Sequence, residues 1–294
     1  MASAAERPEP TVLDGVSPSV VGARVDCAAT TTCTVTWELA RAPVRIYAGA
    51  APGSIDRSTP AGVVTTGTEI TLANPDPGAP RYFEVVAKGR RHGPVVADRF
   101  LPLEGTRNAR DLGGYQTVDG RTTKWGRLFR ADGLGGLTDT DRSRLAALGL
   151  PAECPEATDT TGGVPEASPT ADALAAAASA VTTKAARQRD RALLLRLLRD
   201  PDPQWVQCTL FDDRFGWSAS LVLASLGVSK ETVAADHLRG TPVAAPPLPD
   251  RRYLDLAFAA IEERYGDWGT YLGQGLGLDQ RTYDRLRKRY VSGL

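Results

Sequence analysis

The strongest constraint on the fold of this chain is a change in sequence pattern near residues 101–108. Residues 11–100 are dense in Val and Thr, and Gly, Pro and Asp separate short runs of strand-forming residues. Such a pattern is typical of an antiparallel β-sandwich. Downstream, the pattern becomes mixed α/β and then helical. We therefore predict two domains: an all-β sandwich over residues 11–100, followed by an α/β domain over residues 101–294 with a helix-rich C-terminal half.

The first predicted domain contains four clear strand-like runs, at residues 33–37, 44–47, 69–72 and 82–87. Trp37 and Tyr82 are large aromatic residues within these runs, so we expect both to anchor the core. The arrangement resembles a fibronectin type III domain and covers about a third of the chain. It contains no cluster of residues typical of catalysis.

Charge and hydropathy exclude several classes of partner. Lys and Arg together number 35, as do Asp and Glu, so the formal net charge is zero. A chain without a net charge has no overall field that attracts nucleic acid or an anionic membrane, and we expect neither as a partner. No stretch approaches about 18 uninterrupted apolar residues, and the first ten residues lack the apolar core of a signal peptide. We therefore expect a cytoplasmic protein.

The four cysteines, Cys27, Cys33, Cys154 and Cys208, match no zinc spacing and are too few for a disulfide framework. The first two are close enough in sequence to pair across a hairpin. In a reducing compartment, however, we expect them to be free and partly buried.

No metal or cofactor is expected. His92 and His237 lie outside the segments that carry chemistry, and His237 is expected to be structural. Arg127 and Arg130 are expected to be scaffold cations. The sequence contains no Walker loop, dinucleotide fingerprint or His-Glu-x-x-His motif.

The chain beyond residue 138 is predicted to be mainly helical. A short helix is expected at residues 139–148, with Thr138 as its N-cap and Gly149 as its end. Residues 151–169 are rich in Pro, Gly, Thr and Glu and predict a loop. One strand is expected at residues 204–208, and further helices are expected at residues 171–199 (as one helix or a pair), 216–226, 230–238, 253–265, 268–272 and 280–290.

Cys208 and Arg214 are separated by five residues and lie between the last expected strand and the apolar helix that follows it. A loop that leads into a helix N-terminus is the layout of an anion site. In a cysteine-dependent phosphatase, such a loop surrounds a phosphoryl group, the Arg binds two of its oxygens and the thiolate attacks phosphorus. The alternatives are that Cys208 is a buried apolar residue at a strand end, and that Arg214 pairs with Asp212 or Asp213.

Motifs elsewhere strengthen the phosphatase interpretation. Residues 108–115 read Asn-Ala-Arg-Asp-Leu-Gly-Gly-Tyr, and residues 119–132 contain Lys-Trp-Gly-Arg-Leu-Phe-Arg-Ala-Asp. With the tail at 261–278, these motifs resemble the bacterial tyrosine-phosphatase-like family, which includes dual phosphoprotein and phosphoinositide phosphatases. The resemblance spans about residues 101–294 and implies a tyrosine-phosphatase-like α/β fold with Cys208 as nucleophile.

The signature loop, residues 207–216, departs from the family pattern H-C-x-x-G-K-D-R-T-G at four positions. Gln207 replaces the His, Phe211 the Gly, Asp212 the Lys and Phe215 the Thr. A buried strand that ends in Asp-Leu-Arg in the family is also expected to be absent, because residues 150–159 contain two prolines.

Each departure is expected to weaken either the binding of a phosphate ester or its hydrolysis. Gln207 is a neutral amide and Asp212 is negative, so both leave the Cys208 thiol harder to ionise. A charge pair about 5 Å apart in an effective dielectric of about 20 is worth on the order of 3 kcal/mol, so exchanging Lys for Asp predicts weaker binding of a dianionic phosphate. Phe211 removes the glycine that lets the backbone close on the anion, and Phe215 removes a hydroxyl that assists departure of the thiolate.

Three functions are consistent with these residues. The first is a phosphatase scaffold redirected to a neutral or apolar small-molecule substrate, for a cyclisation, dehydration or isomerisation in secondary metabolism. In that enzyme, Asp212 or Asp213 moves protons and Arg214 stabilises developing oxyanion charge. The expected substrate-binding residues are Phe211, Phe215, Trp217, Gln207, Arg110 and Asp111, although the last two match a family loop that more simply supports the signature loop.

The second function is a catalytically inactive pseudophosphatase, a binding or regulatory module that engages a protein partner. The third is a Cys-dependent phosphatase that uses Cys208 and Arg214 on a phosphorylated small molecule. Loss of phosphate release in Cys208→Ser identifies the third function. Loss of turnover in Asp212→Asn identifies the first.

Overall fold

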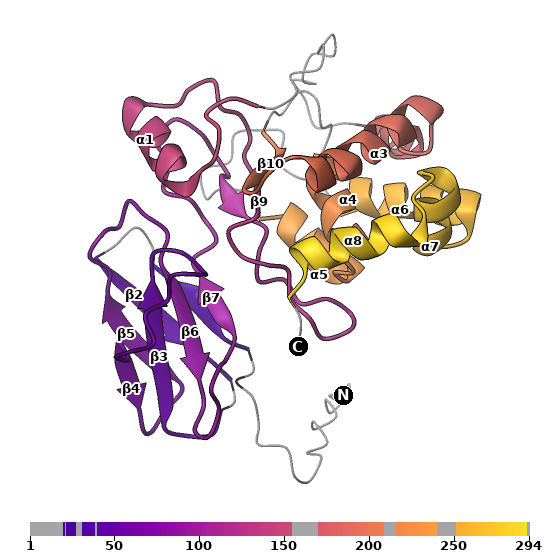
Figure 1. Cartoon of the computed structure of the whole chain (residues 1–294). Coiled ribbons are helices and arrows are strands. Elements are labelled where there is room, and N and C mark those ends of the chain that lie inside the picture. The colour runs from indigo at the N-terminus through magenta and orange to yellow at the C-terminus, as the bar shows by residue number, and fades with distance from the viewer. Residues whose placement is uncertain are drawn as a thin grey trace, which may run out of the picture.

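The computed structural model of the chain describes residues 20, 22–27, 31–38, 40–154, 170–208, 216–239 and 251–292 (Figure 1). Within these residues, strands β1 to β7 precede residue 100, and strands β8 to β10 and the helices follow it.

Two antiparallel sheets form the N-terminal part of the molecule. Their strands are β1 (Arg24–Asp26), β2 (Thr32–Thr36), β3 (Val44–Gly49), β4 (Gly62–Val64), β5 (Glu69–Ala73), β6 (Tyr82–Val86) and β7 (Val95–Ala97). The strand orders are β1-β2-β5 and β4-β3-β6-β7. Alternate side chains of both sheets meet in one hydrophobic cluster, which includes Val35, Ile46 and Phe83. Trp37 lies in this cluster and Tyr82 is also buried, as predicted.

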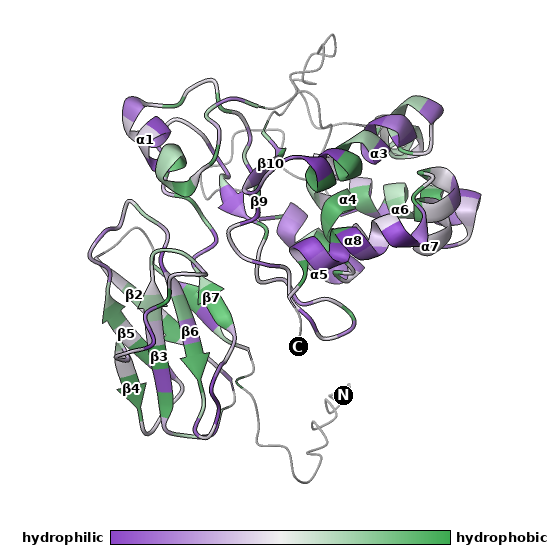
Figure 2. Cartoon of the chain, viewed as in Figure 1, coloured by the Kyte–Doolittle hydropathy of each residue, from purple (hydrophilic) through white to green (hydrophobic). Residues whose placement is uncertain are grey.

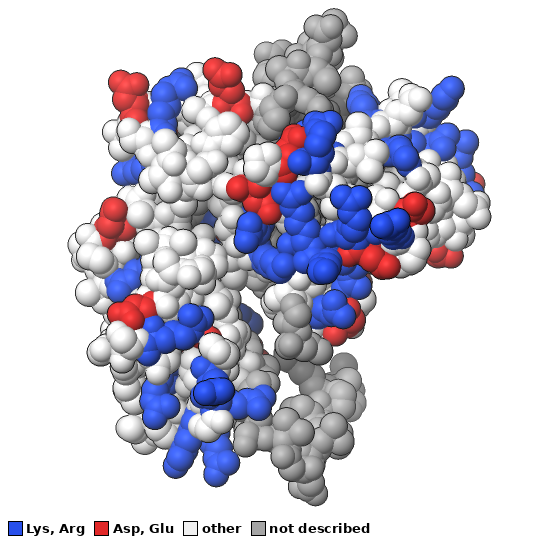
Figure 3. Space-filling model, viewed as in Figure 1, with Lys and Arg blue, Asp and Glu red and all other residues white. Residues whose placement is uncertain are grey.

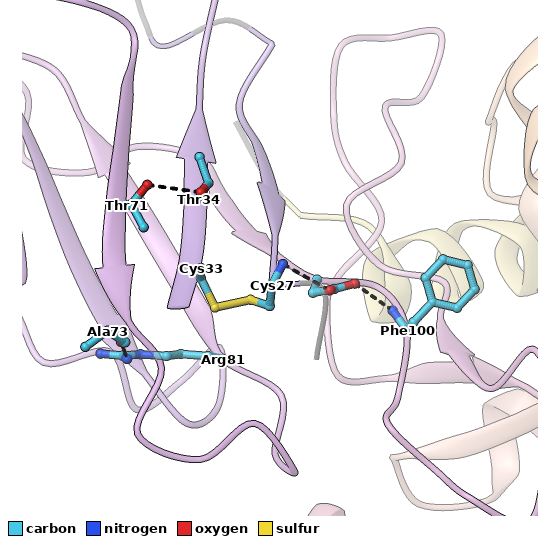
Figure 4. The surroundings of a disulfide bond; sticks show 8 residues. Cys27, Cys33, Thr34, Thr71, Ala73, Arg81 and Phe100 are labelled. Carbon is cyan, nitrogen blue, oxygen red and sulfur yellow. Dashed lines mark hydrogen bonds between the residues drawn. A yellow bond between two sulfur atoms is a disulfide. The ribbon is translucent and has the colours of Figure 1, made fainter. Parts of the chain in front are cut away.

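Cys27 and Cys33 are joined by a disulfide within this cluster (Figure 4). The backbone N–H of Cys27 also donates a hydrogen bond to Asp98 at 3.2 Å. The prediction that these cysteines are free is therefore wrong. The antiparallel pairing of β1 with β2 brings the two sulfur atoms together, an arrangement that the sequence left as the alternative.

A third, short sheet lies in the C-terminal part. It consists of β8 (Arg110–Asp111), β9 (Leu128–Arg130) and β10 (Gln204–Gln207). β9 is the middle strand, antiparallel to β8 and parallel to β10. Parallel neighbours need a long crossover, and α1, α2 and α3 supply it here. The register pairs Gln207 with Arg130, which sets the following residue, Cys208, beside the C-terminal end of β9.

The helices are α1 (Asp139–Leu148), α2 (Ala171–Ala180), α3 (Lys184–Arg199), α4 (Trp217–Ser225), α5 (Lys230–His237), α6 (Arg251–Tyr265), α7 (Trp268–Thr270) and α8 (Gln280–Tyr290), with a π-helical turn η2 at Tyr271–Gly275. The predicted ends of α1 are confirmed. Thr138 accepts a hydrogen bond from the backbone N–H of Asp141, and Gly149 ends the helix with a left-handed φ of 74°. Residues 171–199 form a pair of helices rather than one.

α4 lies in the core of the C-terminal part. Seven of its nine residues are buried, and the surrounding cluster draws on α2, α3, α5, α6, η2 and α8. Figure 2 shows α4 as largely hydrophobic, whereas α8 carries many polar residues. Because α4 is packed on most of its surface, its first residue and the preceding Gly216 have a fixed position.

The β-sheets of residues 24–97 contact the rest of the chain through Tyr82 and Trp125. Their rings meet edge to face with centroids 6.3 Å apart. The indole N–H of Trp125 donates to the carbonyl of Val95 at 2.8 Å, and the guanidinium of Arg99 lies 4.9 Å from the centroid of the same indole. These contacts join residues on both sides of the boundary expected at residue 100, and the division into two domains stays a prediction.

Residues 150–154 contain no strand in the structure. This agrees, for these five residues, with the expected absence of the family's Asp-Leu-Arg strand. Residues 155–169, which include the rest of that segment and most of the predicted loop, lie outside the described residues.

Candidate active site

The signature loop is flanked by a strand, β10, and a helix, α4. β10 leads directly to Cys208, and Gly216 is the N-cap of α4 with a left-handed φ of 74°. The strand and the helix predicted around the loop are therefore confirmed. The predicted site residues between them lie outside the described residues, so their roles stay predictions; these are Phe211, Asp212, Asp213, Arg214 and Phe215.

Cys208 is bonded to Cys154 by a disulfide. Its side chain is buried in a cluster with Phe129 and Trp205, on the side of the sheet that packs against α1. Burial at a strand end is thus confirmed, but Cys208 is not a free cysteine, because all four cysteines are paired in two disulfides. A sulfur atom in a disulfide is neither a thiolate nor a nucleophile, so Cys208 has to be reduced before it can react with phosphorus.

Gln207 stands where the family has a histidine. Its side chain is buried, and its Oε1 atom accepts no hydrogen bond within the described parts of the chain. Its backbone carbonyl accepts a hydrogen bond from Ala131 at 2.9 Å, which fixes the end of β10 against β9. The neutral amide adds no positive charge next to Cys208.

Arg110 forms a buried ion pair with Asp236 of α5. Its Nε and Nη2 atoms each donate to one carboxylate oxygen, both at 3.0 Å. Nη2 also donates to the backbone carbonyl of Asp236, and Nη1 donates to the carbonyl of Arg239 and to Asn108 Oδ1. All five N–H groups of this guanidinium are therefore engaged within the protein. The geometry favours the structural role of Arg110 over substrate binding.

Asp236 is the centre of this buried network. The hydroxyl of Tyr115 donates to its Oδ1 atom, and Nη1 of Arg130 lies 3.8 Å from its Oδ2 atom. Burial alone would raise the pKa of Asp236, but the charges of Arg110 and Arg130 and the hydrogen bonds from Arg110 and Tyr115 together outweigh burial and lower the pKa to about 2. Asp236 is therefore a carboxylate at neutral pH, with two guanidinium groups beside it.

Arg130 and His237 lie beneath the start of α4. A β-carbon built on Gly216 would be 3.2 Å from Nδ1 of His237 and 3.4 Å from Nη2 of Arg130. Both side chains are buried, one on β9 and the other on α5. The sequence assigned both residues to the scaffold, because nothing in the local pattern indicated that β9 and α5 meet at the end of the signature loop.

Asp111 lies on β8, and its side chain contacts Tyr82 of β6. Its carboxylate accepts hydrogen bonds from the backbone N–H groups of Gly113 and Gly126, each at 2.7 Å, and from the hydroxyl of Tyr82 at 3.5 Å. Burial raises the pKa of Asp111 to about 6, although these hydrogen bonds oppose the shift. The carboxylate joins two loops and a strand of the neighbouring sheet, so the geometry favours a structural role here too.

Trp217, which was expected to line a substrate pocket, is buried in the helical core. Its indole N–H donates to the carboxylate of Asp190 at 3.0 Å, and the hydroxyl of Tyr271 donates to the same carboxylate at 2.8 Å. The Trp217 ring also meets the rings of Phe258 and Trp268 edge to face. Burial raises the pKa of Asp190 to about 6. A carboxyl in an aromatic setting is thus found on α3, whereas the setting predicted for the carboxyls of the signature loop lies outside the described residues.

The described residues include no group of three or more His, Cys, Asp or Glu side chains placed to hold a metal ion. His92 pairs with Glu84 at 3.1 Å. Among the helices that the structure describes, none is both long and apolar enough to cross a membrane. Figure 3 shows Lys and Arg side chains gathered over α8, whose last turn contains Arg287, Lys288 and Arg289. The expected absence of metals, nucleic acid and membrane partners, and the cytoplasmic location, stay predictions.

The short mixed sheet, with β9 parallel to β10, and the helices that pack around it form an α/β fold in the C-terminal part of the chain. A family model described as "Tyrosine phosphatase family" matches residues 101–154 and 156–292. Because the match covers more than half of the chain, the chain belongs to the tyrosine phosphatase family.

Two individual proteins are similar to parts of the chain. A protein of Cupriavidus necator named "Putative tyrosine-protein phosphatase" is 27% identical over 264 residues, which cover 71% of this chain and 94% of that protein. The solved structure of an Fn3-like protein from Clostridium thermocellum covers 30% of this chain and 96% of its own, with 20% identity and a TM-score of 0.23. The second similarity is too low to support an argument, and the fibronectin type III resemblance stays a prediction.

Proposed function

We propose that the chain is a cysteine-dependent phosphatase that acts when the disulfide between Cys154 and Cys208 is reduced. The observation that carries the proposal is the position of Cys208, directly after the parallel strand β10 and before the buried helix α4. Membership of the tyrosine phosphatase family supports the same chemistry.

The reaction has two steps. The Cys208 thiolate attacks phosphorus and the bond from phosphorus to the leaving oxygen breaks, while that oxygen takes up a proton from solvent water. Water then attacks the phosphocysteine, which releases phosphate and restores the thiolate. Arg214 binds two non-bridging oxygens, and the N-terminus of α4 adds the positive end of its dipole.

We expect slow turnover and weak binding of phosphate dianions. Gln207 offers no charge to the thiolate, and Asp212 places a negative charge where the family has a positive one. The substrate class that fits best is a phosphorylated small molecule whose remaining atoms contribute binding energy of their own.

A pseudophosphatase with a protein partner is the second candidate. The observation that favours it is the same disulfide, since a sulfur atom bonded to Cys154 cannot act as a nucleophile. The acid/base enzyme that the sequence also indicated has no support in the described geometry, because Asp212 and Asp213 lie outside it. The similarities with known proteins point to phosphatases.

The test is phosphate release by the full chain after treatment with dithiothreitol. We expect release from p-nitrophenyl phosphate and from a panel of phosphorylated small molecules, and a loss of at least about 100-fold in Cys208→Ser. A reduced wild-type protein that is no faster than Cys208→Ser on every substrate would overturn the proposal and favour the pseudophosphatase.

A further inference from the structure

A small pocket lies at the turn between β6 and β7, at one end of the N-terminal sheets. Residues 87 and 89–93 line this turn pocket together with Val20, and its volume is about 370 Å³. Gly89 has a left-handed φ of 80°, and a β-carbon built on it would meet nothing within 4 Å. The space in front of this part of the backbone is therefore open. The volume lies in the range of pockets that hold small molecules.

The cations around the turn pocket have no acidic partners. Arg90 and Arg91 line the pocket, and the carbonyl of Arg41 accepts a hydrogen bond from the backbone N–H of Lys88 at 2.9 Å. Arg45 lies on β3, beside the end of β6. All five side chains are exposed, and none forms an ion pair within the described part of the chain. Figure 3 shows Lys and Arg side chains gathered at the lower end of these sheets. Their charges are therefore available to a ligand.

Glu84 is an acidic residue that contacts the pocket lining, and protein groups bind both of its carboxylate oxygens. Oε1 contacts Nδ1 of His92 at 3.1 Å and accepts the backbone N–H of Gly93 at 3.2 Å. Oε2 accepts Nε of Arg57 at 2.6 Å. Arg57 thus balances the charge of Glu84, and the pocket keeps its excess of positive charge. The same carboxylate holds the imidazole of His92 through one nitrogen and leaves the other for a ligand.

Backbone groups of the turn add further donors. Among the described residues, the N–H groups of Gly89, Arg91 and His92 donate to no protein acceptor. Backbone N–H groups in a turn that contains a left-handed residue form concave sites for anions. A phosphate group offers three strong acceptor oxygens, and the fork of an arginine guanidinium matches two of them.

We propose that the turn pocket binds a phosphate group, either as free phosphate or as part of a phosphorylated small molecule. Arg90 and Arg91 supply the charge, and the backbone N–H groups of residues 89–92 fix the position of the oxygens. No cysteine lines the pocket, so this site is independent of the reaction at Cys208. It adds a binding role for the N-terminal sheets.

The test is a titration of the full-length wild-type chain, labelled with nitrogen-15 and kept without reductant. Cys208 then stays bonded to Cys154 and cannot attack the probe. The probes are phenylphosphonate, whose bond from carbon to phosphorus resists hydrolysis, inorganic phosphate and succinate. We expect phenylphosphonate to shift the amide resonances of residues 89–93 until they saturate, and succinate to bind at least about tenfold more weakly. Tighter binding of phenylphosphonate than of phosphate identifies a phosphorylated molecule as the ligand, and the reverse order identifies free phosphate.

The matched variants separate this pocket from other cations of the chain. A chain with both Arg90→Gln and Arg91→Gln should bind phenylphosphonate at least about tenfold more weakly, because two charged donors are lost. Arg90→Lys with Arg91→Lys keeps the charges but not the forks and should give an intermediate affinity. Arg142→Gln removes an exposed arginine on α1 and should leave the affinity unchanged.

Three results would overturn the inference. The first is the absence of saturable shifts at residues 89–93, and the second is an equal affinity in wild type and in the chain with both Gln substitutions. The third is a succinate affinity equal to that of phenylphosphonate, which indicates a general attraction of anions. Shifts at these residues with RNA but not with phenylphosphonate would also contradict it and identify a surface for polyanions. Circular dichroism checks that each variant is folded.

Discussion

The sulfur atoms of Cys154 and Cys208 form a bond between the segment after α1 and the end of β10. The two residues are 54 positions apart, and both contact the cluster that packs α1 against the short sheet. Cys208, which the family resemblance implies is the nucleophile, is therefore bonded to Cys154, for which the sequence predicted no role.

This bond predicts a dependence on reductant. Wild-type protein should release phosphate only after treatment with dithiothreitol, whereas Cys154→Ser should be active without it, because its Cys208 is a free thiol. Phosphate release with and without dithiothreitol is the measurement. Cys27→Ser is the control, since its partner is Cys33, and it should keep the reductant requirement. Equal activity of oxidised wild type and Cys154→Ser would contradict this prediction.

Restoring positive charge to the signature loop should restore affinity for phosphate. Asp212→Lys changes the local charge by two units, and one charge pair at about 5 Å is worth on the order of 3 kcal/mol before screening. We expect KM for p-nitrophenyl phosphate to fall at least about tenfold in the reduced protein. Asp212→Asn should give an intermediate value. A KM that does not follow the charge at position 212 would show that this residue does not face the substrate.

Asp236 should be essential for stability. Asp236→Asn leaves Arg110 buried without its counter-charge, and breaking a buried pair in this way costs about 3–5 kcal/mol. Urea unfolding at pH 7 measures the loss. Asp255→Asn, on the exposed pair with Arg251, should barely change the free energy of unfolding. Similar stabilities of the two variants would refute the assignment of Asp236 as the centre of the network.

Asp190 predicts a specific dependence of stability on pH. Its pKa is raised by burial to about 6 in the folded protein from an ordinary value of 3.8, so between these values the folded state binds more protons than the unfolded state. The stability of wild type relative to Asp190→Asn should therefore increase as pH falls from 7 to 4, by up to about 3 kcal/mol. Urea unfolding of both proteins at several pH values tests this. If the difference in stability between wild type and Asp190→Asn does not change with pH, the pKa of Asp190 is not raised by folding.

Trp125 should stabilise the contact between the N-terminal sheets and the rest of the chain. Trp125→Ala removes the packing against Tyr82 and the hydrogen bond to Val95, and we expect a loss of about 3 kcal/mol in the free energy of unfolding. Phe100→Ala removes an exposed ring nearby and should have a much smaller effect. If both substitutions cost the same, the Tyr82–Trp125 contact contributes little.

Local elements of this fold could be predicted from the sequence. The two ends of α1 depend on Thr138, Asp141 and Gly149, and each of these acts on backbone groups within about four residues of itself. The strand before Cys208 and the buried helix after Gly216 follow equally from short runs of apolar residues. Hydrogen bonds of this range are set by neighbouring residues, so a local pattern suffices.

The partners of the candidate site residues could not be predicted in this way. Four cysteines allow three pairings, and sequence spacing does not choose among them. Arg110 and Asp236 are 126 positions apart, and the sequence offered Arg110 as a substrate contact because its saturated hydrogen bonding appears only once β8 and α5 meet. Trp217 was placed in a pocket for the same reason, since the carboxylate that it binds lies on another helix.

The amino-acid sequence by itself determined most of the helices and five of the strands, the family to which residues 101–292 belong, and the position of the cysteine on which the chemistry depends. The tertiary structure alone decided that Cys208 bonds to Cys154 and that Arg130 lies beneath Gly216. The physical reason is range: capping and periodicity act over a few residues, whereas disulfides and buried charges depend on which distant segments the packed core brings into contact.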